Sequence, residues 1–335
     1  MEVTTLTMNT TVSSPWYNTH LQKATFSAYI ILLLIGTVGN SLVVICVALN
    51  KVLHNPTFAA IASLAVADFL FLCWRIPMEI LHILNKNWIS GTTVCKMSFL
   101  VYQLTSYSAA YHLVLLSAIR FYSLVYPFQA LQHLTVRRSC IMCGVLWVGV
   151  FICISPVLFT SGIVKQEFNG RVYVYCAVET TEPLRASLIY SCLYAVFSYF
   201  IPLLMITVLH VTKVYRVTRM SREMSRSYTH QLSSMVVVVL LLFGGLLLPV
   251  HLKNILILGG VSVLQRMPEL DLVCRCMAYA NSCINPYVYA FFSKQFRRSL
   301  TRMLPCCKAE EVSPMHGGRS GNVQTTSTNV QTTSA

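Results

Sequence analysis

Long apolar runs, separated by short polar segments, dominate the pattern along the chain. Runs free of Asp, Glu, Lys and Arg cover residues 24–50, 97–119, 139–164, 186–212, 231–252 and 276–293. A further run over residues 52–74 is interrupted only by Asp68. A helix rises about 1.5 Å per residue, so about 18 residues cross a hydrocarbon core of roughly 30 Å. The pattern predicts an all-α membrane protein, a seven-transmembrane helix bundle with its termini on opposite sides.

The composition agrees with a membrane protein. The 335 residues are 55% hydrophobic and 11% charged, whereas soluble domains carry about 25% charged residues. So little charge cannot cover a water-soluble globule, which excludes a soluble enzyme, a disordered protein and a collagen-like protein. The formal net charge of +14 is compatible with nucleic acid or an anionic membrane surface as a partner, and the apolar runs favour the membrane.

The distribution of Lys and Arg along the chain predicts the orientation of the bundle in the membrane. With the N-terminus outside, the cytoplasmic segments hold 15 of the 25 Lys and Arg residues and 3 of the 11 acids. Cytoplasmic loops are enriched in Lys and Arg, so we expect the N-terminus outside and the C-terminus in the cytoplasm. Asn9, in Asn9-Thr10-Thr11, then lies outside as a glycosylation sequon.

The chain divides into four parts. We expect an extracellular N-terminus over residues 1–25, the bundle over 26–293, a membrane-surface helix over 294–304 and a disordered cytoplasmic tail over 305–335. Phe292, Phe296 and Leu300 recur at i, i+4 and i+8, the spacing of an amphipathic helix on a membrane. From residue 313 the tail is mainly Ser, Thr, Gly, Asn and Gln, which is typical of disorder.

Modification sites are expected on the cytoplasmic side. Cys306 and Cys307 follow the basic amphipathic stretch and predict palmitoylation, with unmodified thiols as the alternative. The Thr and Ser clusters at 325–328 and 332–334 could carry phosphates and form an anionic docking strip, with a plain flexible tail as the alternative.

The outer loop before the fifth span carries a hairpin signal. Asn169-Gly170 lies between alternating residues in the segment 164–175, which predicts a β-hairpin. Cys95 opens the third span and Cys176 follows this segment. Both are expected on the outer, oxidising side, where a disulfide persists.

Polar residues inside the spans are candidates for function. Asp68 lies in the middle of a span, where a charge costs several kcal/mol unless it faces polar partners. Its candidate partners are Asn40, Asn281, Ser282 and Asn285. Proline removes a backbone hydrogen bond and kinks a helix. Such kinks are expected at Pro202, Pro249 and Pro286.

The order of these motifs resembles the rhodopsin-like (class A) G-protein-coupled receptors over residues 26–304. The markers are Gly39-Asn40, Leu64-Ala-Val-Ala-Asp68, Trp88, Cys95, Arg120, Tyr126-Pro127, Trp147, Pro202, Phe243, Pro249, Asn285-Pro286-Tyr287-Val288-Tyr289 and Phe292-x-x-x-Phe296-Arg297. The resemblance implies a plasma-membrane receptor, a Cys95–Cys176 disulfide, an eighth helix on the membrane, a heterotrimeric G protein as partner and arrestin binding through a phosphorylated tail. It assigns the switch to Asp68, Arg120, Phe243, Pro249, Asn285, Pro286 and Tyr289.

The resemblance also limits the ligand. A retinal-binding lysine is replaced by Tyr279, and the aspartate that binds amines is replaced by Tyr102. Nucleotide receptors carry His-x-x-basic after the sixth-span proline, and here Asn254 stands in place of the basic residue, so a nucleotide is a weak alternative. Residues 278–290 look most like the somatostatin, opioid, galanin and melanin-concentrating-hormone receptors, which implies an extracellular peptide ligand.

The corresponding positions predict a ligand cavity. Its candidate residues are Arg75, Met78, Glu79, Tyr102, Gln103, Ser106, His251, Asn254, Asp271 and Arg275. Two arrangements stay open. Glu79 and Arg275 form a structural pair, or they do not pair and Arg75, Lys253 and Arg275 make the cavity cationic and suited to a ligand carboxylate.

Several positions depart from the family. Ile119 replaces the acid that normally holds Arg120 in the inactive state, and no acid stands at the start of the sixth span. The usual Trp and Tyr of the sixth and fifth spans are Leu247 and His210, and Ala109 replaces a sodium-binding Ser, which makes sodium near Asp68 doubtful. The departures predict raised basal signalling, with an orphan or virus-type receptor acting as a constitutive signaller or decoy as the alternative.

Other classes have less support. A channel or transporter would carry an inverted repeat or several intramembrane charges, and Asp68 is the one deep charge in the sequence. No metal-ligand spacing, phosphate loop or nucleophile motif appears, so no enzyme activity, cofactor or nucleic acid partner is expected.

Overall fold

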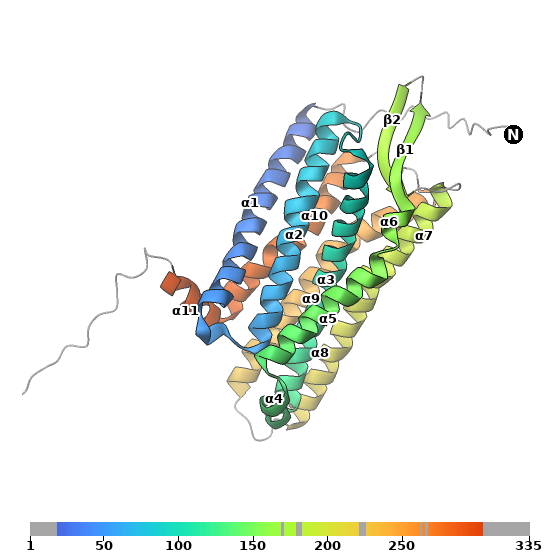
Figure 1. Ribbon diagram of the computed structural model, residues 1–335. Helices are drawn as coiled ribbons and strands as arrows, with labels where there is room; N and C mark the ends of the chain where they lie inside the picture. The colour runs from blue at the N-terminus through green and yellow to red at the C-terminus, as the bar shows by residue number, and fades with distance from the viewer. Residues whose placement is uncertain are drawn as a thin grey trace, which may run out of the picture.

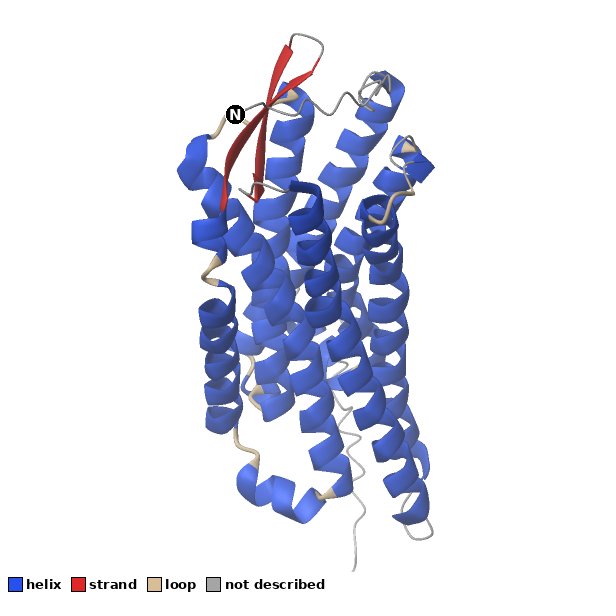
Figure 2. Ribbon diagram, turned by 90° about the vertical axis from the view of Figure 1, so that its right-hand side faces the viewer, coloured by secondary structure: helices blue, strands red, loops and turns tan. Residues whose placement is uncertain are grey.

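The computed structural model describes residues 19–168, 171–178, 183–220, 226–261, 263–264 and 267–303. The predictions for Asn9, for Cys306 and Cys307 and for the C-terminal tail lie outside these residues. Long helices run side by side, and a two-stranded hairpin stands over one end of them (Figure 1; Figure 2). We call this the hairpin end, and the opposite end, where α11 (Lys294–Met303) lies, the α11 end.

The long helices account for the predicted spans. The first four are α1 (Thr19–Leu49), α2 (Pro56–Asn85), α3 (Gly91–Val125) and α5 (Val136–Ile154). The fifth consists of α7 (Pro183–Ala195), the π-helical segment η3 (Val196–Phe200) and α8 (Ile201–Met220). The sixth and seventh are α9 (Arg226–Leu258) and α10 (Pro268–Phe292). Shorter elements are η2 (Lys51–Leu53), α4 (Pro127–His133) and α6 (Val157–Thr160).

Hydropathy separates α10 from the other spans. In the described part of the chain, six helical segments are long and apolar enough to cross a membrane, and α10 is not among them. It carries three charged residues, Glu269, Asp271 and Arg275, and several amide and hydroxyl side chains. It nevertheless packs along α1 and α9 and contacts α2, in the place of the seventh span (Figure 1). The predicted all-α membrane bundle is therefore confirmed.

Helix ends differ from the apolar runs where capping residues decide them. α2 begins at Pro56, not at residue 52, because the Asn55 side chain accepts a hydrogen bond from the Phe58 amide at 3.1 Å and caps the helix. α1 begins at Thr19, before the predicted boundary at residue 26, since its polar first turns contain no Pro or Gly. The predicted fourth span, residues 139–164, is shifted rather than shortened: the structure has it over Val136–Thr160, where α5 ends at Ile154, two residues before Pro156, and α6 follows.

The fifth span widens into a π-helix where the sequence predicts a kink. Pro202 has no N–H, and its ring clashes with the carbonyl four residues earlier, that of Ser198. The wider turn of η3 lies directly before this proline. It also presents Tyr199, whose hydroxyl donates to the Gly244 carbonyl of α9 at 2.6 Å. The proline-induced irregularity therefore links the fifth span to the sixth.

The predicted hairpin is present and longer than expected. β1 (Ser161–Phe168) pairs antiparallel with β2 (Arg171–Val178), with Ser161 opposite Val178. A disulfide joins Cys176 of β2 to Cys95 of α3, with the two Cα atoms 5.5 Å apart. The Trp88 amide donates to the Val174 carbonyl at 2.8 Å, and the Val174 amide donates to Asn87 at 2.9 Å. These bonds fix β2 to the end of the bundle.

Breaking this disulfide is expected to destabilise the receptor. Loss of a native disulfide costs about 2–5 kcal/mol in small secreted domains, so Cys176→Ser should lower the thermal unfolding temperature of the purified protein. Cys192→Ser, which removes a free cysteine of α7, is the matched control and should leave it unchanged. Free thiols at both Cys95 and Cys176 in mass spectra of non-reduced protein would contradict the pairing.

Candidate functional site

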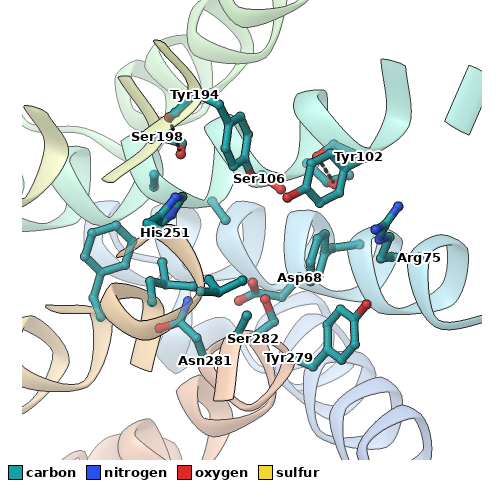
Figure 3. A pocket seen from close by; sticks show the side chains of 18 of the residues that line it. Asp68, Arg75, Tyr102, Ser106, Tyr194, Ser198, His251, Tyr279, Asn281 and Ser282 are labelled. Atoms are coloured by element: carbon teal, nitrogen blue, oxygen red, sulfur yellow. Dashed lines mark hydrogen bonds between the residues drawn. The ribbon is translucent and has the colours of Figure 1, made fainter. Parts of the chain in front are cut away.

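Two cavities at the hairpin end share a wall. The deeper one, of about 230 Å³, reaches from Arg75 down to Asp68 and Phe243 (Figure 3). The outer one, of about 570 Å³, is lined on one side by Tyr175 and Cys176 of β2. The residues that line both are Arg75, Tyr102, Tyr190, Lys253 and Arg275. A molecule in the outer cavity, beneath the hairpin, is therefore separated from the deeper cavity by this shared wall.

Five charged side chains from α2, α9 and α10 form a cluster at the shared wall. Glu79 accepts a hydrogen bond from Arg275 Nη1 at 2.9 Å and forms an ion pair with Arg75, one turn earlier on α2. Asp271 accepts from Arg275 Nε at 2.8 Å and pairs with Lys253 of α9. Of the two arrangements left open by the sequence, the structure has the one in which Glu79 and Arg275 pair.

The cluster carries an excess of positive charge. Three cations face two carboxylates within it. Glu79 is 8% exposed and Lys253 is 7% exposed, so water screens their charges weakly. The Arg75 guanidinium also lies over the Tyr102 ring, 4.8 Å from its centroid, in a cation–π contact. One positive charge is thus left without a matching carboxylate in this cluster.

Aromatic rings make up much of the remaining wall. Tyr102 stacks on Tyr194 at 5.5 Å between ring centroids, and Tyr194 contacts His251 at 5.6 Å. Tyr279 meets Tyr29 edge-on at 5.3 Å. Sequence reasoning did not single out Tyr190 or Tyr194, because an aromatic residue in a buried helix is equally typical of core packing.

The structure brings most of the predicted ligand residues together, with one exception. Ser106, His251 and Asn254 line the deeper cavity, Met78, Glu79 and Asp271 line the outer one, and Arg75, Tyr102 and Arg275 line both. Gln103 lines neither cavity. Successive helical residues are turned by about 100°, so Tyr102 and Ser106 share one face of α3 while Gln103 belongs to the next. Gln103 instead lines a groove between α3, α5 and the α7–η3 segment.

A polar junction lies at the bottom of the deeper cavity. Asp68 is fully buried and accepts a hydrogen bond from Asn285 Nδ2 at 2.8 Å. Asn40 donates to the Gly36 and Ser282 carbonyls at 2.9 and 3.0 Å. Asn285 and Ser282 are thus the predicted partners that contact Asp68, and Asn40 joins α1 to the α10 backbone instead.

The surroundings of Asp68 offer a sodium ion oxygen atoms from α2 and α10, but none from the side chains of Ala109 and Ala110 on α3. The Oδ1 atom of Asp68 has no hydrogen-bond partner among the described residues, and the side chains of Asn281 and Ser282 lie nearby (Figure 3). A hard cation needs several oxygen ligands, and α3 presents Ala109 and Ala110 on its side of the cavity.

The α11 end of α3 holds the predicted switch arginine. Ile119, before Arg120, is 2% exposed and packs in the main hydrophobic core. Lys213 of α8 is 3% exposed and lies close enough to Arg120 for the two positive charges to repel each other. Tyr289 of α10 is also buried, and its hydroxyl has no hydrogen-bond partner in the described part of the chain. Lys213 is one of the 15 Lys and Arg residues assigned to the cytoplasmic side from the sequence, and its burial was not predicted.

A second buried polar group was also missed. His112 of α3 bonds through Nε2 to the Ser63 hydroxyl at 2.7 Å and through Nδ1 to the Ser108 carbonyl at 2.6 Å. Trp147 Nε1 donates to the same Ser63 hydroxyl at 3.1 Å. The three side chains hold α2, α3 and α5 together, which gives Trp147, a marker in the sequence, a structural role.

Comparisons with known proteins agree with this architecture. The family model of the 7 transmembrane receptor (rhodopsin family) matches residues 39–289. The chain is 30% identical to the allatostatin-A receptor of Bombyx mori over 302 residues, which cover 88% of this chain and 82% of that protein. Galanin receptor 2b of Danio rerio is 29% identical, with 82% and 73% covered. A purinoceptor of Cavia porcellus is 28% identical, with 82% and 76% covered.

The chain belongs to the rhodopsin family of seven-transmembrane receptors. It is therefore a multi-pass membrane protein and a G-protein-coupled receptor by family, and its relatives are receptors, not enzymes. These findings confirm the resemblance seen in the ordered motifs.

Replacing Glu79 with Gln is expected to destabilise the bundle, because two guanidinium groups then face each other with one carboxylate fewer. Breaking a buried pair costs about 3–5 kcal/mol. The Arg75 and Arg275 side chains are each 32% exposed, so solvent should reduce the cost to about 2 kcal/mol. Thermal unfolding of Glu79→Gln, Arg275→Gln and the double variant measures the coupling. Additive losses in the double variant would contradict a direct pair.

Proposed function

We propose that this receptor binds an extracellular peptide in the two cavities at the hairpin end and transmits the signal to a heterotrimeric G protein at the α11 end. The observation that carries the proposal is the charged cluster of Glu79, Arg275 and their neighbours at the shared wall beneath the hairpin. Relatives named for the peptides allatostatin-A and galanin support this ligand class.

The proposed orientation places the hairpin end outside the cell. The excess of Lys and Arg in the segments at the α11 end supports it. The Cys95–Cys176 disulfide lies at the hairpin end, and disulfides persist in the oxidising extracellular environment. In this orientation Asn9 is available for glycosylation, and Cys306 and Cys307 are available for palmitoylation beside α11. A phosphorylated tail would then bind arrestin.

A ligand carboxylate would balance the charge of the cluster. Among the described residues, Arg75 has a single carboxylate partner, Glu79, whereas Arg275 contacts both Glu79 and Asp271. Arg75 also lines both cavities, so it can reach a ligand in either. We therefore assign the ligand carboxylate, a peptide C-terminus or an acidic side chain, to Arg75 rather than to Arg275 alone.

Matched peptides test this assignment in cells that express the receptor. Active peptides are compared as free acid and C-terminal amide, and we expect the amide to need a concentration about tenfold higher, because a charge-assisted bond contributes roughly 1.5–3 kcal/mol. Arg75→Gln should remove most of this difference. Lys86→Gln removes an exposed cation from the same end of α2 and should leave it unchanged. Equal potency of acid and amide on the unmodified receptor would exclude recognition of a C-terminal carboxylate.

A nucleotide is the second candidate ligand. Arg75, Lys253 and Arg275 line the outer cavity together, and one relative is named a purinoceptor. Adenine nucleotides belong in the same assay, where activation by a nucleotide without any active peptide would favour this candidate.

The proposed mechanism is a shift between two populations of the bundle. Ligand at the shared wall favours an arrangement in which α9, which contains Pro249, moves outward and opens a cleft for the G protein. Phe243 lines the deeper cavity and contacts Tyr199, so it couples ligand to this movement. Asp68, Asn285, Pro286 and Tyr289 relay it along α10, and Arg120 lines the cleft. An orphan receptor that signals constitutively, or a decoy, is the reserve function.

Raised signalling without ligand is expected from Ile119. An apolar side chain there cannot accept a hydrogen bond from Arg120, and a charge-assisted bond contributes roughly 1.5–3 kcal/mol. Ile119→Asp should therefore lower agonist-free signalling by about tenfold or more at equal surface expression. Because Ile119 is buried in the core, Ile119→Asn controls for lost packing without adding a charge. A silent unmodified receptor would favour the decoy, and equal signalling from the Asp and Asn variants would contradict the missing acid as the cause.

A further inference from the structure

Lys213 of α8 is a buried cation in a part of the bundle whose helices lack acidic residues. The sequences of α3, α8 and α9 contain no Asp or Glu. The whole segment over residues 183–268, which includes α8 and α9, holds a single acid, Glu223. Lys213 is nevertheless only 3% exposed. A buried charge is costly unless a counter-charge lies beside it, and α3, α8 and α9 have no side chain that could supply one.

Other polar groups near Lys213 also lack partners. Lys213 pairs with no carboxylate of the described residues, and Arg120 of α3 lies near it. His210 lies near Lys213 on the same helix, and its buried Nδ1 atom has no hydrogen-bond partner in the described part of the chain. The Tyr289 hydroxyl, near Arg120, is likewise buried without a partner among the described residues. Because α3 and α8 pack against each other, groups from both helices can face one ligand.

This combination of charges and donors indicates a bound anion. Water can hydrate Lys213 but cannot neutralise two neighbouring cations, whose repulsion is strong where little water screens it. The Cβ atoms of residues three apart on a helix lie about 5–6 Å apart, so one small anion can contact both His210 and Lys213. The Nδ1 atom of His210 donates to it when that atom carries the ring proton. The burial of Lys213 and Tyr289 favours a small ion over a bulky phosphate ester.

We propose that a small monovalent inorganic anion, of which chloride is an example, binds between α3 and α8, at Lys213 and His210 on one side and Arg120 on the other. The Tyr289 hydroxyl of α10 is a further donor toward this site. Asp68 also interacts with Tyr289 and repels an anion, so the ion belongs nearer to the cations of α3 and α8.

The anion would restrain the bundle at its α11 end. It takes the place of a carboxylate that neither Ile119 nor any other residue of α3 supplies, and it attracts the cations of both helices. An ion that binds the closed arrangement more tightly than the open one lowers the population of the open one. This restraint rests on the proposed function, whereas anion binding itself does not.

Chloride binding to the purified receptor in phosphatidylcholine nanodiscs tests the site. Chloride that exchanges with a protein site gives a broadened chlorine NMR line, and we expect the receptor to broaden this line beyond empty nanodiscs. Lys213→Gln should remove most of the excess broadening. Arg216→Gln is the matched control, because it removes an exposed cation about one turn further along α8, and it should keep the broadening. Equal loss in both variants would overturn the assignment to Lys213.

Thermal unfolding of the unmodified receptor gives a second measurement. Chloride that binds only the folded protein raises its unfolding temperature, so replacing chloride with gluconate at constant ionic strength should lower that temperature by a few degrees. No difference between the two salts would overturn the proposal, and a lower unfolding temperature of Glu223→Gln would then identify this acid as the counter-charge. A response that is lost in Arg75→Gln and kept in Lys213→Gln would place chloride in the ligand cavity, which also overturns it.

Variants at residue 119 test the restraint. Nucleotide exchange by a G protein reconstituted with the receptor is measured without ligand, and replacing chloride with gluconate should raise it severalfold. Lys213→Gln should not respond, which controls for effects of chloride on the G protein itself. Ile119→Asp supplies a carboxylate and should lose the response, while Ile119→Asn should keep it.

The two parts of the proposal fail separately. Equal responses of the Ile119→Asp and Ile119→Asn receptors to the change of salt would overturn the anion as a restraint. Absence of exchange in every variant would contradict the proposed function, and the NMR and unfolding measurements would still decide whether the anion binds.

Discussion

The bundle depends on the buried polar junction of α1, α2 and α10. Asp68 and Asn285 bond side chain to side chain, and Asn40 bonds to the Ser282 carbonyl. In a bilayer no water replaces such partners, so the junction holds the most polar span, α10, in the interior. The junction also requires α1 and α10 to pack closely, because a Cβ atom added to Gly36 of α1 would lie only 2.7 Å from Cys283 Sγ of α10. The polar contacts and the lack of a side chain at Gly36 thus together hold α10 against α1 and α2.

The position of α10 determines the chemistry of the ligand wall. Arg275 lies ten residues before Asn285, about 15 Å along the helix. From there it reaches Glu79 of α2, while Asp271, one turn further, pairs with Lys253 of α9. The proposed ligand carboxylate would compete with these carboxylates for the same cations. Because Lys253 belongs to α9, such competition acts directly on the helix whose movement the proposed mechanism requires.

Apolar periodicity and motif order were enough to predict the spans and the family, because both are local properties of the sequence. Exact helix ends, the direction in which one side chain points and contacts between separate helices could not be predicted from these local properties. The Asn55 cap shifts the start of α2, and one step of about 100° turns Gln103 out of the ligand cavity. Whether Glu79 contacts Arg275 depends on the distance between α2 and α10. The apolar periodicity of each helix does not determine that distance.

The α11 end adds a further physical reason for weak restraint of the inactive state. An acid before Arg120 would offset its charge, but Ile119 contributes only packing to the core. Lys213 is buried close to the same arginine, and like charges with little water between them repel strongly. Any separation of α3 from α8 reduces this repulsion and admits water to both cations. In the proposed mechanism, the missing acid and the buried lysine would therefore favour the same opening, the one that would admit a G protein.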